Sequence, residues 1–135
     1  MTRKWLLLFL FLASSGCASI SDYRFRSATE RRAKIAWRDC KESVCENDRT
    51  SDYADGFQAG YVDVCRGGDG TCPAVPPSCY WGAKFQTNEG MARVNKWYAG
   101  FARGAAESMQ CGCNLRNNVP SRACGCPTDP QCSLN

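Results

Sequence analysis

One pattern of aromatic residues and glycines occurs twice in this chain of 135 residues, and its two copies lie 44 residues apart. The pattern is aromatic-x2-Gly-Phe-x2-Gly, and it runs from Tyr53 to Gly60 and again from Trp97 to Gly104. Spacings of three and four residues place its members on one face of a helix. Because a glycine inside a helix costs about 1 kcal/mol relative to alanine, the pattern predicts two helices in which a close contact requires glycine.

Glycines four residues apart flatten one side of a helix and allow a second backbone to approach closely. We expect the two repeats to cross at their glycine faces, with the phenylalanines sandwiched between them. The residues assigned to this contact are Gly56, Phe57, Gly60, Gly100, Phe101 and Gly104. The alternative is that the aromatic stripe lines a ligand groove. Core packing is favoured, because aromatic stripes at helical spacing usually face a core.

Start and stop signals predict three helices, over about 27–45, 51–66 and 88–109, and hence an all-α fold. In the first helix, apolar residues recur every three or four positions, and Ser27 with Glu30 forms a candidate capping box. Acidic residues suit the first turn of the second helix, and a run of glycines ends it. A long Gly/Pro-rich loop is expected before the third helix, and an irregular cysteine-rich tail after it.

The loop before the third helix contains two adjacent aromatic residues and one aspartate between glycines. Tyr80 and Trp81 are expected to lie back over the helices as a lid on a small core. Asp69 stands between glycines and is interpreted as part of a tight turn. The alternative of a calcium site lacks the ladder of oxygen ligands that such a loop requires.

The N-terminus has the layout of an export signal. Two basic residues precede an apolar run over 5–13, which is too short to span a bilayer, and small residues follow it. Ser15 and Gly16 directly before Cys17 resemble the lipobox of bacterial lipoproteins, in which the peptidase cuts before the cysteine and the sulfur carries the lipid. Ser14 departs from that pattern, because leucine is usual three residues before the cysteine.

The sequence therefore predicts an exported lipoprotein of the bacterial cell envelope, anchored to a membrane by a lipid on Cys17. Conventional cleavage near Ala18 and an uncleaved anchor are the alternatives. The expected organisation is a signal peptide at 1–16, an anchor and tether at 17–26, a helical domain at 27–110 and a cysteine-rich tail at 111–135.

Eleven cysteines are unusual in a chain of this length. With Cys17 lipidated an even number remains, and an oxidising compartment favours disulfides among them. The candidates are Cys40, Cys45, Cys65, Cys72, Cys79, Cys111, Cys113, Cys124, Cys126 and Cys132. A thiolate metal site is the alternative, but the tail cysteines follow C-x-C spacing instead of the C-x2-C spacing of common zinc sites. No metal and no cofactor are therefore predicted.

Parity constrains the pairing of these cysteines. Five of them precede the tail and five lie in it, so complete pairing within one chain requires at least one disulfide between tail and core. The tail has few aliphatic residues, and we expect a covalent link to hold it. Cys40 and Cys45 are not expected to pair with each other, because five residues along a helix turn them about 140° apart unless the helix has already ended.

The composition excludes several classes of function. The chain has no histidine, which removes Ser-His-Asp catalysis, Cys-His catalysis and imidazole metal sites. A net charge of +4 is too small for a strong nucleic-acid footprint, so no nucleic-acid partner is predicted. Basic residues gather over 24–41, where we expect a solvated helix face. The alternative is that this face lies against anionic headgroups close to a lipidated Cys17.

Three functions from different classes fit these features. The favoured one is a non-catalytic, lipid-anchored envelope protein that is structural or binds an envelope partner, and is therefore not an enzyme. The second is a thiol-based redox or metal-handling protein that uses the tail cysteines. The third is a hydrolase with Asp55 and Asp63 as paired carboxylates, although acidic residues on an exposed helix face are usually only solvated.

Six motifs occur in order along about residues 28–109. They are Asp52-Tyr-Ala-Asp-Gly-Phe-Gln-Ala-Gly-Tyr-Val-Asp-Val, Gly67-Gly-Asp-Gly, Pro73-Ala-Val-Pro-Pro, Tyr80-Trp81, Gln86-Thr-Asn-Glu-Gly and Trp97-Tyr-Ala-Gly-Phe-Ala-Arg-Gly-Ala. The set resembles a family of small exported proteins, many with lipobox-like signals, found in planctomycete-type bacteria. The resemblance implies an envelope location and assigns no catalytic residue. The tail from Cys111 onward lies outside it.

Overall fold

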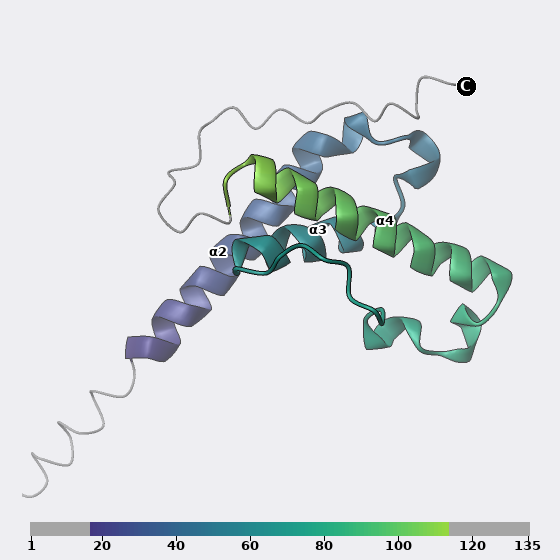
Figure 1. The fold of residues 1–135 in the computed structure, drawn as a ribbon, viewed down its shortest axis with the longest axis horizontal. Coiled ribbons are helices and arrows are strands. Elements are labelled where there is room, and N and C mark those ends of the chain that lie inside the picture. Colours follow the sequence, from purple (N-terminus) through teal and green to yellow (C-terminus); the bar gives the residue numbers. More distant parts are fainter. Residues whose placement is uncertain (1–16, 114–135) are drawn as a thin grey trace, which may run out of the picture.

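The structure is a computed structural model that describes residues 17–113 (Figure 1). Its helices are α2 (Cys17–Cys40), α3 (Ser51–Cys65) and α4 (Asn88–Gln110). Short 3-10 turns occur at Lys41–Ser43, Glu46–Asp48, Ser78–Tyr80 and Ala83–Phe85. The described residues contain no β-strand, so the prediction of an all-α fold with three helices is confirmed.

The first helix differs most from its predicted bounds. α2 is already helical at Cys17, so the segment 17–26 that was expected as a tether is helix. Neither proline nor glycine interrupts the chain between Cys17 and Val44, which allows this continuation. At the other end α2 stops at Cys40, and the predicted extension to residue 45 is replaced by 3-10 turns.

The predicted capping box in this helix is wrong. Ser27 lies in the interior of α2, where its hydroxyl accepts a hydrogen bond of 2.9 Å from Arg31. Glu30 forms an ion pair of 3.2 Å with Arg66, at the end of α3. A capping box forms only at the first turn of a helix, where backbone N–H groups have no partner within the helix. Because α2 starts earlier, Ser27 and Glu30 lie beyond its first turn.

The other two helices begin and end within a residue of the predicted bounds. Each has a threonine as N-cap: Thr50 accepts a hydrogen bond from the backbone N–H of Tyr53, and Thr87 accepts one from that of Gly90. A side-chain oxygen in this position satisfies a backbone donor that has no partner within the helix.

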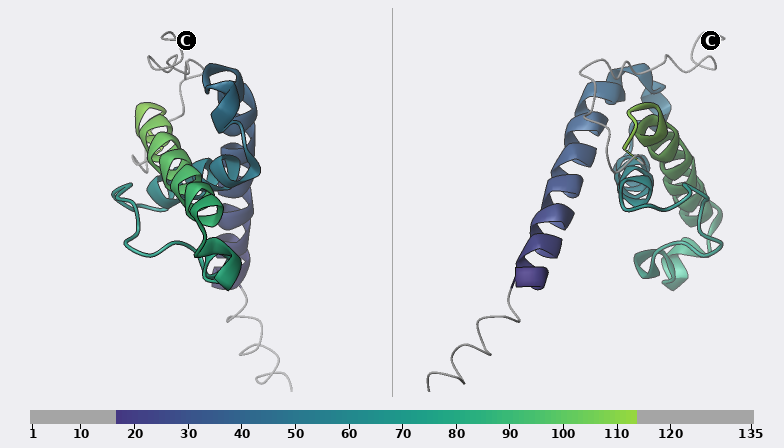
Figure 2. Two further views of the ribbon diagram at one scale, coloured as in Figure 1. Left: turned by 90° about the vertical axis from the view of Figure 1, so that its right-hand side faces the viewer. Right: turned by 60° about the vertical axis from the view of Figure 1, so that its left-hand side comes forward.

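α3 and α4 lie side by side and run in the same direction (Figures 1 and 2). The glycines of each helix face backbone carbonyl groups of the other, and a Cβ built on any of the four would overlap a carbonyl oxygen. Those oxygens are Trp97 O for Gly56, Phe101 O for Gly60, Tyr53 O for Gly100 and Phe57 O for Gly104. Exchanging the two helices converts each contact into another, so the pair has approximate twofold symmetry.

This contact explains why glycine occurs at all four positions. Each facing oxygen lies where a side chain would begin, and it therefore points at the second Cα hydrogen that only glycine carries. Contacts between Cα–H groups and carbonyl oxygens recur where helices pack this closely. Only glycine fits at these four positions, because the facing backbone atoms cannot move aside as a flexible side chain could.

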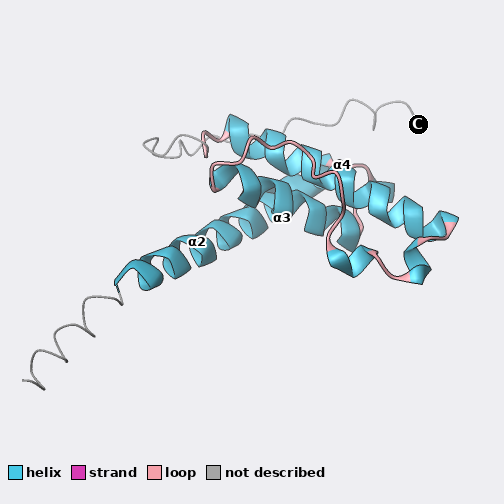
Figure 3. Cartoon of the chain, turned by 60° about the horizontal axis from the view of Figure 1, so that its bottom comes forward, coloured by secondary structure: helices cyan, strands magenta, loops and turns pink. Residues whose placement is uncertain are grey.

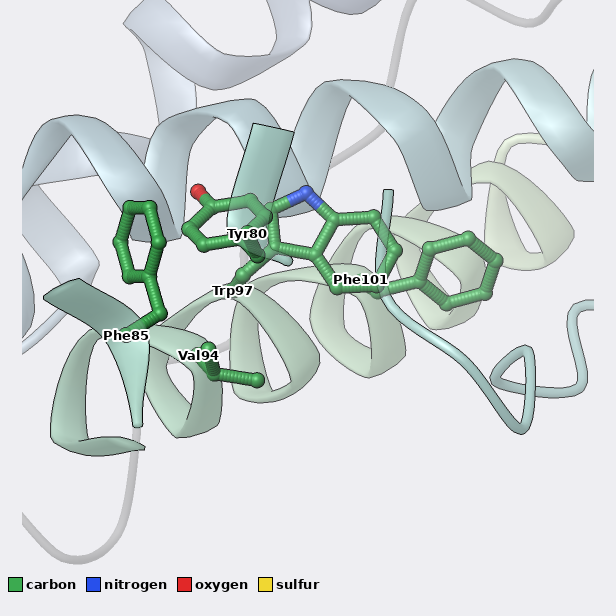
Figure 4. Packing of buried hydrophobic residues seen from close by; sticks show 5 residues of the cluster. All are labelled: Tyr80, Phe85, Val94, Trp97 and Phe101. Atoms are coloured by element: carbon green, nitrogen blue, oxygen red, sulfur yellow. The ribbon is translucent and has the colours of Figure 1, made fainter. Parts of the chain in front are cut away.

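The phenylalanines are not sandwiched between the helices as predicted, because the touching backbones leave no space for a ring. They lie in two separate clusters instead. Phe57 packs with Ala33, Cys40 and Tyr61, against α2. Phe101 packs with Tyr80, Phe85, Val94 and Trp97, beneath the loop before α4 (Figure 4).

The predicted lid is only half right. Tyr80 is buried in the second cluster, where its ring centroid lies 5.0 Å from that of Phe85. Trp81 is 62% exposed, and its indole N–H donates a hydrogen bond of 2.8 Å to the carbonyl oxygen of Pro76 within the loop. The 3-10 turn ends at Tyr80, and Trp81 follows it as the C-cap.

The glycine contact generates a stability prediction. We expect Gly60→Ala to lower the free energy of unfolding by about 1–3 kcal/mol, because its Cβ collides with backbone. This is the opposite of the gain of about 1 kcal/mol that alanine brings to an unconstrained helix. Gly104→Ala should behave in the same way by symmetry, and leucine at either position should cost more.

Thermal unfolding measures this change, at roughly 4–8 °C per kcal/mol for a domain of this size. Gly82→Ala is the matched control, because no atom lies within 4 Å of a Cβ built there. A higher melting temperature for Gly60→Ala would show that the backbones do not touch.

Candidate functional site

A buried polar cluster lies where the start of α3 meets the loop and α4. Its centre is Asp52, which is 6% exposed. The Asp52 carboxylate accepts hydrogen bonds of 2.8 and 3.0 Å from Nε and Nη2 of Arg93, and one of 2.8 Å from the hydroxyl of Tyr80. Three segments that are distant in sequence thus share one carboxylate.

The electrostatics of this cluster favour a fixed ion pair. The Arg93 hydrogen bonds hold the pKa of Asp52 below its ordinary value of 3.8 and outweigh the opposing effect of burial. Burial, reinforced by the neighbouring Asp52 carboxylate, raises the pKa of Tyr80. Asp52 is therefore an anion and Tyr80 a neutral phenol at neutral pH. Neither has a pKa near neutrality, as a general acid or base would need.

From the sequence, acidic residues such as Asp52 are expected only to suit the first turn of α3, and Arg93 has no predicted role. Sequence spacing carries no signal for the pair, because its members are 41 residues apart. The parallel packing sets the first turn of α3 beside the second and third turns of α4, and this arrangement places Arg93 beside Asp52. Arg93 also lies over the ring of Phe85, with 5.1 Å between Cζ and the ring centroid.

Asp55 and Asp63, the candidate carboxylate pair, lie on α3 but do different things. Two full turns separate them by about 12 Å along the helix axis, which is too far for a shared site. Asp55 is exposed. The Asp63 carboxylate accepts a hydrogen bond of 3.3 Å from the N–H of Gly70, so it shapes the turn after the helix.

Asp69 has the turn role that its neighbours suggested. Its carboxylate accepts a hydrogen bond of 2.9 Å from the backbone N–H of Thr71, two residues on, as in an Asx turn. This hydrogen bond lowers the pKa of Asp69. The flanking Gly70 has a φ of +75°, which favours glycine at that position.

Seven of the candidate cysteines lie in the described part of the chain. Cys65 and Cys113 form a disulfide across 48 residues, which joins the first residues of the tail to the end of α3. The expected covalent link between tail and core is thus present. Cys40, Cys45 and Cys111 are also disulfide-bonded. Candidates Cys124, Cys126 and Cys132 lie outside the described residues.

Cys72 and Cys79 are free thiols, which corrects their assignment as disulfide candidates. Both are exposed in the loop before α4, and neither sulfur lies within bonding distance of another described cysteine. The Cys72 thiol is directed at the carbonyl oxygen of Tyr98, 3.9 Å away. Because Cys72 and Cys79 are free, the ten candidate cysteines do not all pair within the chain.

One buried acid has a carboxylate oxygen without a hydrogen-bond partner among the described residues. Glu107, near the end of α4, is 2% exposed, and its Oε2 atom has no hydrogen-bond partner there. Burial raises the pKa of Glu107, while the charge of Arg103 opposes that shift.

The described residues hold neither a cluster of metal ligands nor a membrane-spanning helix. Residues 17–113 contain no group of three or more Cys, Asp or Glu side chains arranged to hold a metal ion. In the same segment, none of the helices has the length and apolar character needed to cross a bilayer.

The polar cluster predicts a pH-dependent stability. We expect Asp52→Asn to lower the free energy of unfolding by about 1–3 kcal/mol at pH 7. The pKa of Asp52 is lower in the folded than in the unfolded state, so its stabilisation is complete above the unfolded value. It is lost as the pH falls from about 4 through the folded value.

Urea unfolding from pH 7 down to pH 3 tests this expectation. The difference between the wild-type protein and Asp52→Asn should shrink on acidification, and Asp55→Asn is the control because that side chain is exposed. A difference that stays constant with pH would mean that the carboxylate charge does not hold the cluster together.

The cysteine assignment predicts a labelling pattern. Iodoacetamide added to the denatured, unreduced protein should modify Cys72 and Cys79. Cys65 and Cys113 should react only after reduction, and tryptic cleavage after Arg66 and Arg103 should leave their peptides linked. Peptide mass spectrometry reads out both results. A linkage of Cys65 to any other cysteine would contradict the structure.

Comparison with family models, with curated proteins and with solved structures found no match to this chain.

Proposed function

We propose that this protein is a non-catalytic, lipid-anchored protein of the bacterial cell envelope. In this proposal it is exported, a lipid on Cys17 holds it at a membrane, and its helical domain has a structural or partner-binding role. The observation that carries the proposal is the signal-like N-terminus that ends in Ser15, Gly16 and Cys17.

The position of α2 supports an anchor at Cys17. The helix continues from Cys17 to Cys40, where it packs into the first cluster, so the anchored residue and the domain share one continuous helix. A lipid at this position would hold the domain through a defined element instead of a loose tether. The first half of α2 extends away from the α3–α4 pair, which leaves room for a membrane there (Figure 3).

The disulfides support export. Five described cysteines are oxidised, and the linkage between Cys65 and Cys113 ties distant parts of the domain. Structural disulfides of this kind persist in extracytoplasmic compartments and are rare in the cytosol. The resemblance of the motifs along 28–109 to small exported proteins of planctomycete-type bacteria points in the same direction.

The polar residues support a role without catalysis. Arg93 and Tyr80 are both hydrogen-bonded to Asp52, and Asp63 is used to shape a turn. These arrangements satisfy buried or turn-forming groups, and the pKa of Asp52 is lowered, not raised toward neutral pH.

The second candidate is a thiol-based redox or metal-handling protein. The observation that favours it is the pair of free, exposed thiols at Cys72 and Cys79. Its original basis, the tail, is weaker, because Cys111 and Cys113 are oxidised. Catalytic thiols would need a lowered pKa and a reducible partner.

The anchor is tested by the intact mass of protein purified from membranes in detergent. We expect a chain that begins at Cys17 and carries the added mass of a diacylglyceryl group. Cys17→Ser should abolish this mass and the partition into detergent, whereas Cys72→Ser, a change at an exposed free thiol, should alter neither. A water-soluble species that begins after Ala18 would end the proposal.

A further inference from the structure

α2 has one side that packs on the domain and one that does not. Thr29, Ala33 and Cys40 are buried and define the packed side. At about 100° per residue, the opposite side carries a row of exposed residues that we call the basic face. The basic face consists of Ile20, Tyr23, Arg24, Arg31, Lys34, Ile35 and Arg38.

The basic face has four cations and no acidic residue. Arg24, Arg31 and Lys34 form no ion pair with any acidic residue of the described chain, and Arg31 instead donates to the hydroxyl of Ser27. Arg38 lies 3.6 Å from Asp39 and is the one partly compensated cation of the face. Three positive charges therefore lack a partner within the described domain.

The acidic residues of α2 lie on its flanks and rear. Asp22 lies on the rear and forms an ion pair of 3.3 Å with Arg26, and Glu30 forms one of 3.2 Å with Arg66, the residue after α3. Asp39 is the remaining acidic residue of α2 and lies beside Arg38, so ion pairs with these acids compensate one cation of the basic face.

Apolar side chains stand among the cations. Ile20 is 60% exposed, Tyr23 is 72% exposed and Ile35 is 49% exposed. Aliphatic and aromatic residues mixed with arginine and lysine are typical of helices that lie in the membrane interface. Tyrosine suits the headgroup level, and long cationic side chains reach from there to the phosphates.

The unpaired positive charge of the basic face is complementary to a negatively charged surface. We propose that the basic face of α2 lies on an anionic phospholipid surface, so that the helix rests along the membrane. The inference depends on the proposed anchor, because a lipid on Cys17 would place Ile20 and Tyr23 within two turns of the bilayer. With α2 lying flat, its packed side and the rest of the domain face away from the lipid.

The test uses the full chain with Cys17→Ser, so that no acyl group contributes. Partition onto phosphatidylcholine vesicles is compared with partition onto vesicles that also contain phosphatidylglycerol. The ratio of the two coefficients isolates the electrostatic contribution, because apolar insertion of the N-terminal segment affects both compositions. We expect a ratio well above one that falls at high salt.

The decisive variant is Arg24→Gln/Arg31→Gln/Lys34→Gln. About fivefold is expected for each cation near the surface, so the ratio should fall by roughly a hundredfold. The matched control is Arg49→Gln/Lys84→Gln/Lys96→Gln, which removes the same net charge from outside α2. None of these three cations pairs with an acidic residue of α2, so the control should keep most of the wild-type ratio.

Three results would overturn the inference: an equal fall in both triple variants, no fall in either, or a wild-type ratio near one. Self-association of the wild-type chain that the basic-face triple abolishes would assign the face to a second copy instead. A failure of the anchor proposal would be recognised separately from a failure of this inference. The anchor is tested by the mass at Cys17, which this experiment does not measure.

Discussion

The backbone contact between α3 and α4 constrains the rest of the structure. Four carbonyl oxygens face four glycines, and this arrangement fixes the distance, the register and the direction of the two helices. Helices joined by a short turn run antiparallel, so a parallel pair needs a connection that returns to the starting end. The loop over 66–87 provides that return, and its glycines and prolines suit an irregular path.

The same parallel arrangement creates the polar cluster. It brings the first turn of α3 beside the second turn of α4, where Asp52 and Arg93 meet. The returning loop then adds the hydroxyl of Tyr80 and the ring of Phe85. A buried carboxylate is costly unless its oxygens are satisfied, and three donated hydrogen bonds meet that requirement. The ion pair thus closes the end of the helix pair at which the loop arrives.

Residue spacing predicted the two helices that carry the repeat, but not the contacts that depend on whether those helices run parallel. The doubled glycine pattern indicated two helices and their contact surface, and start and stop signals gave bounds accurate to a residue. Spacing contains no information on whether two helices run parallel, so neither the Asp52–Arg93 pair nor the burial of Tyr80 without Trp81 could be derived. The start of α2 was misplaced because a capping box resembles a start even where helix formers precede it.

The twofold symmetry of α3 and α4 ends at the residues that cover them. Phe57 and Phe101 occupy equivalent positions, yet α2 covers the first and the returning loop covers the second. On α2, the buried residues that cover Phe57 lie between Ala33 and Cys40, so the cover needs only the second half of the helix. The first half contributes little to the core, and its exposed isoleucine, tyrosine and arginine side chains have no role in folding that the contacts explain. The proposed membrane surface would give these exposed side chains a contact that the described domain does not provide.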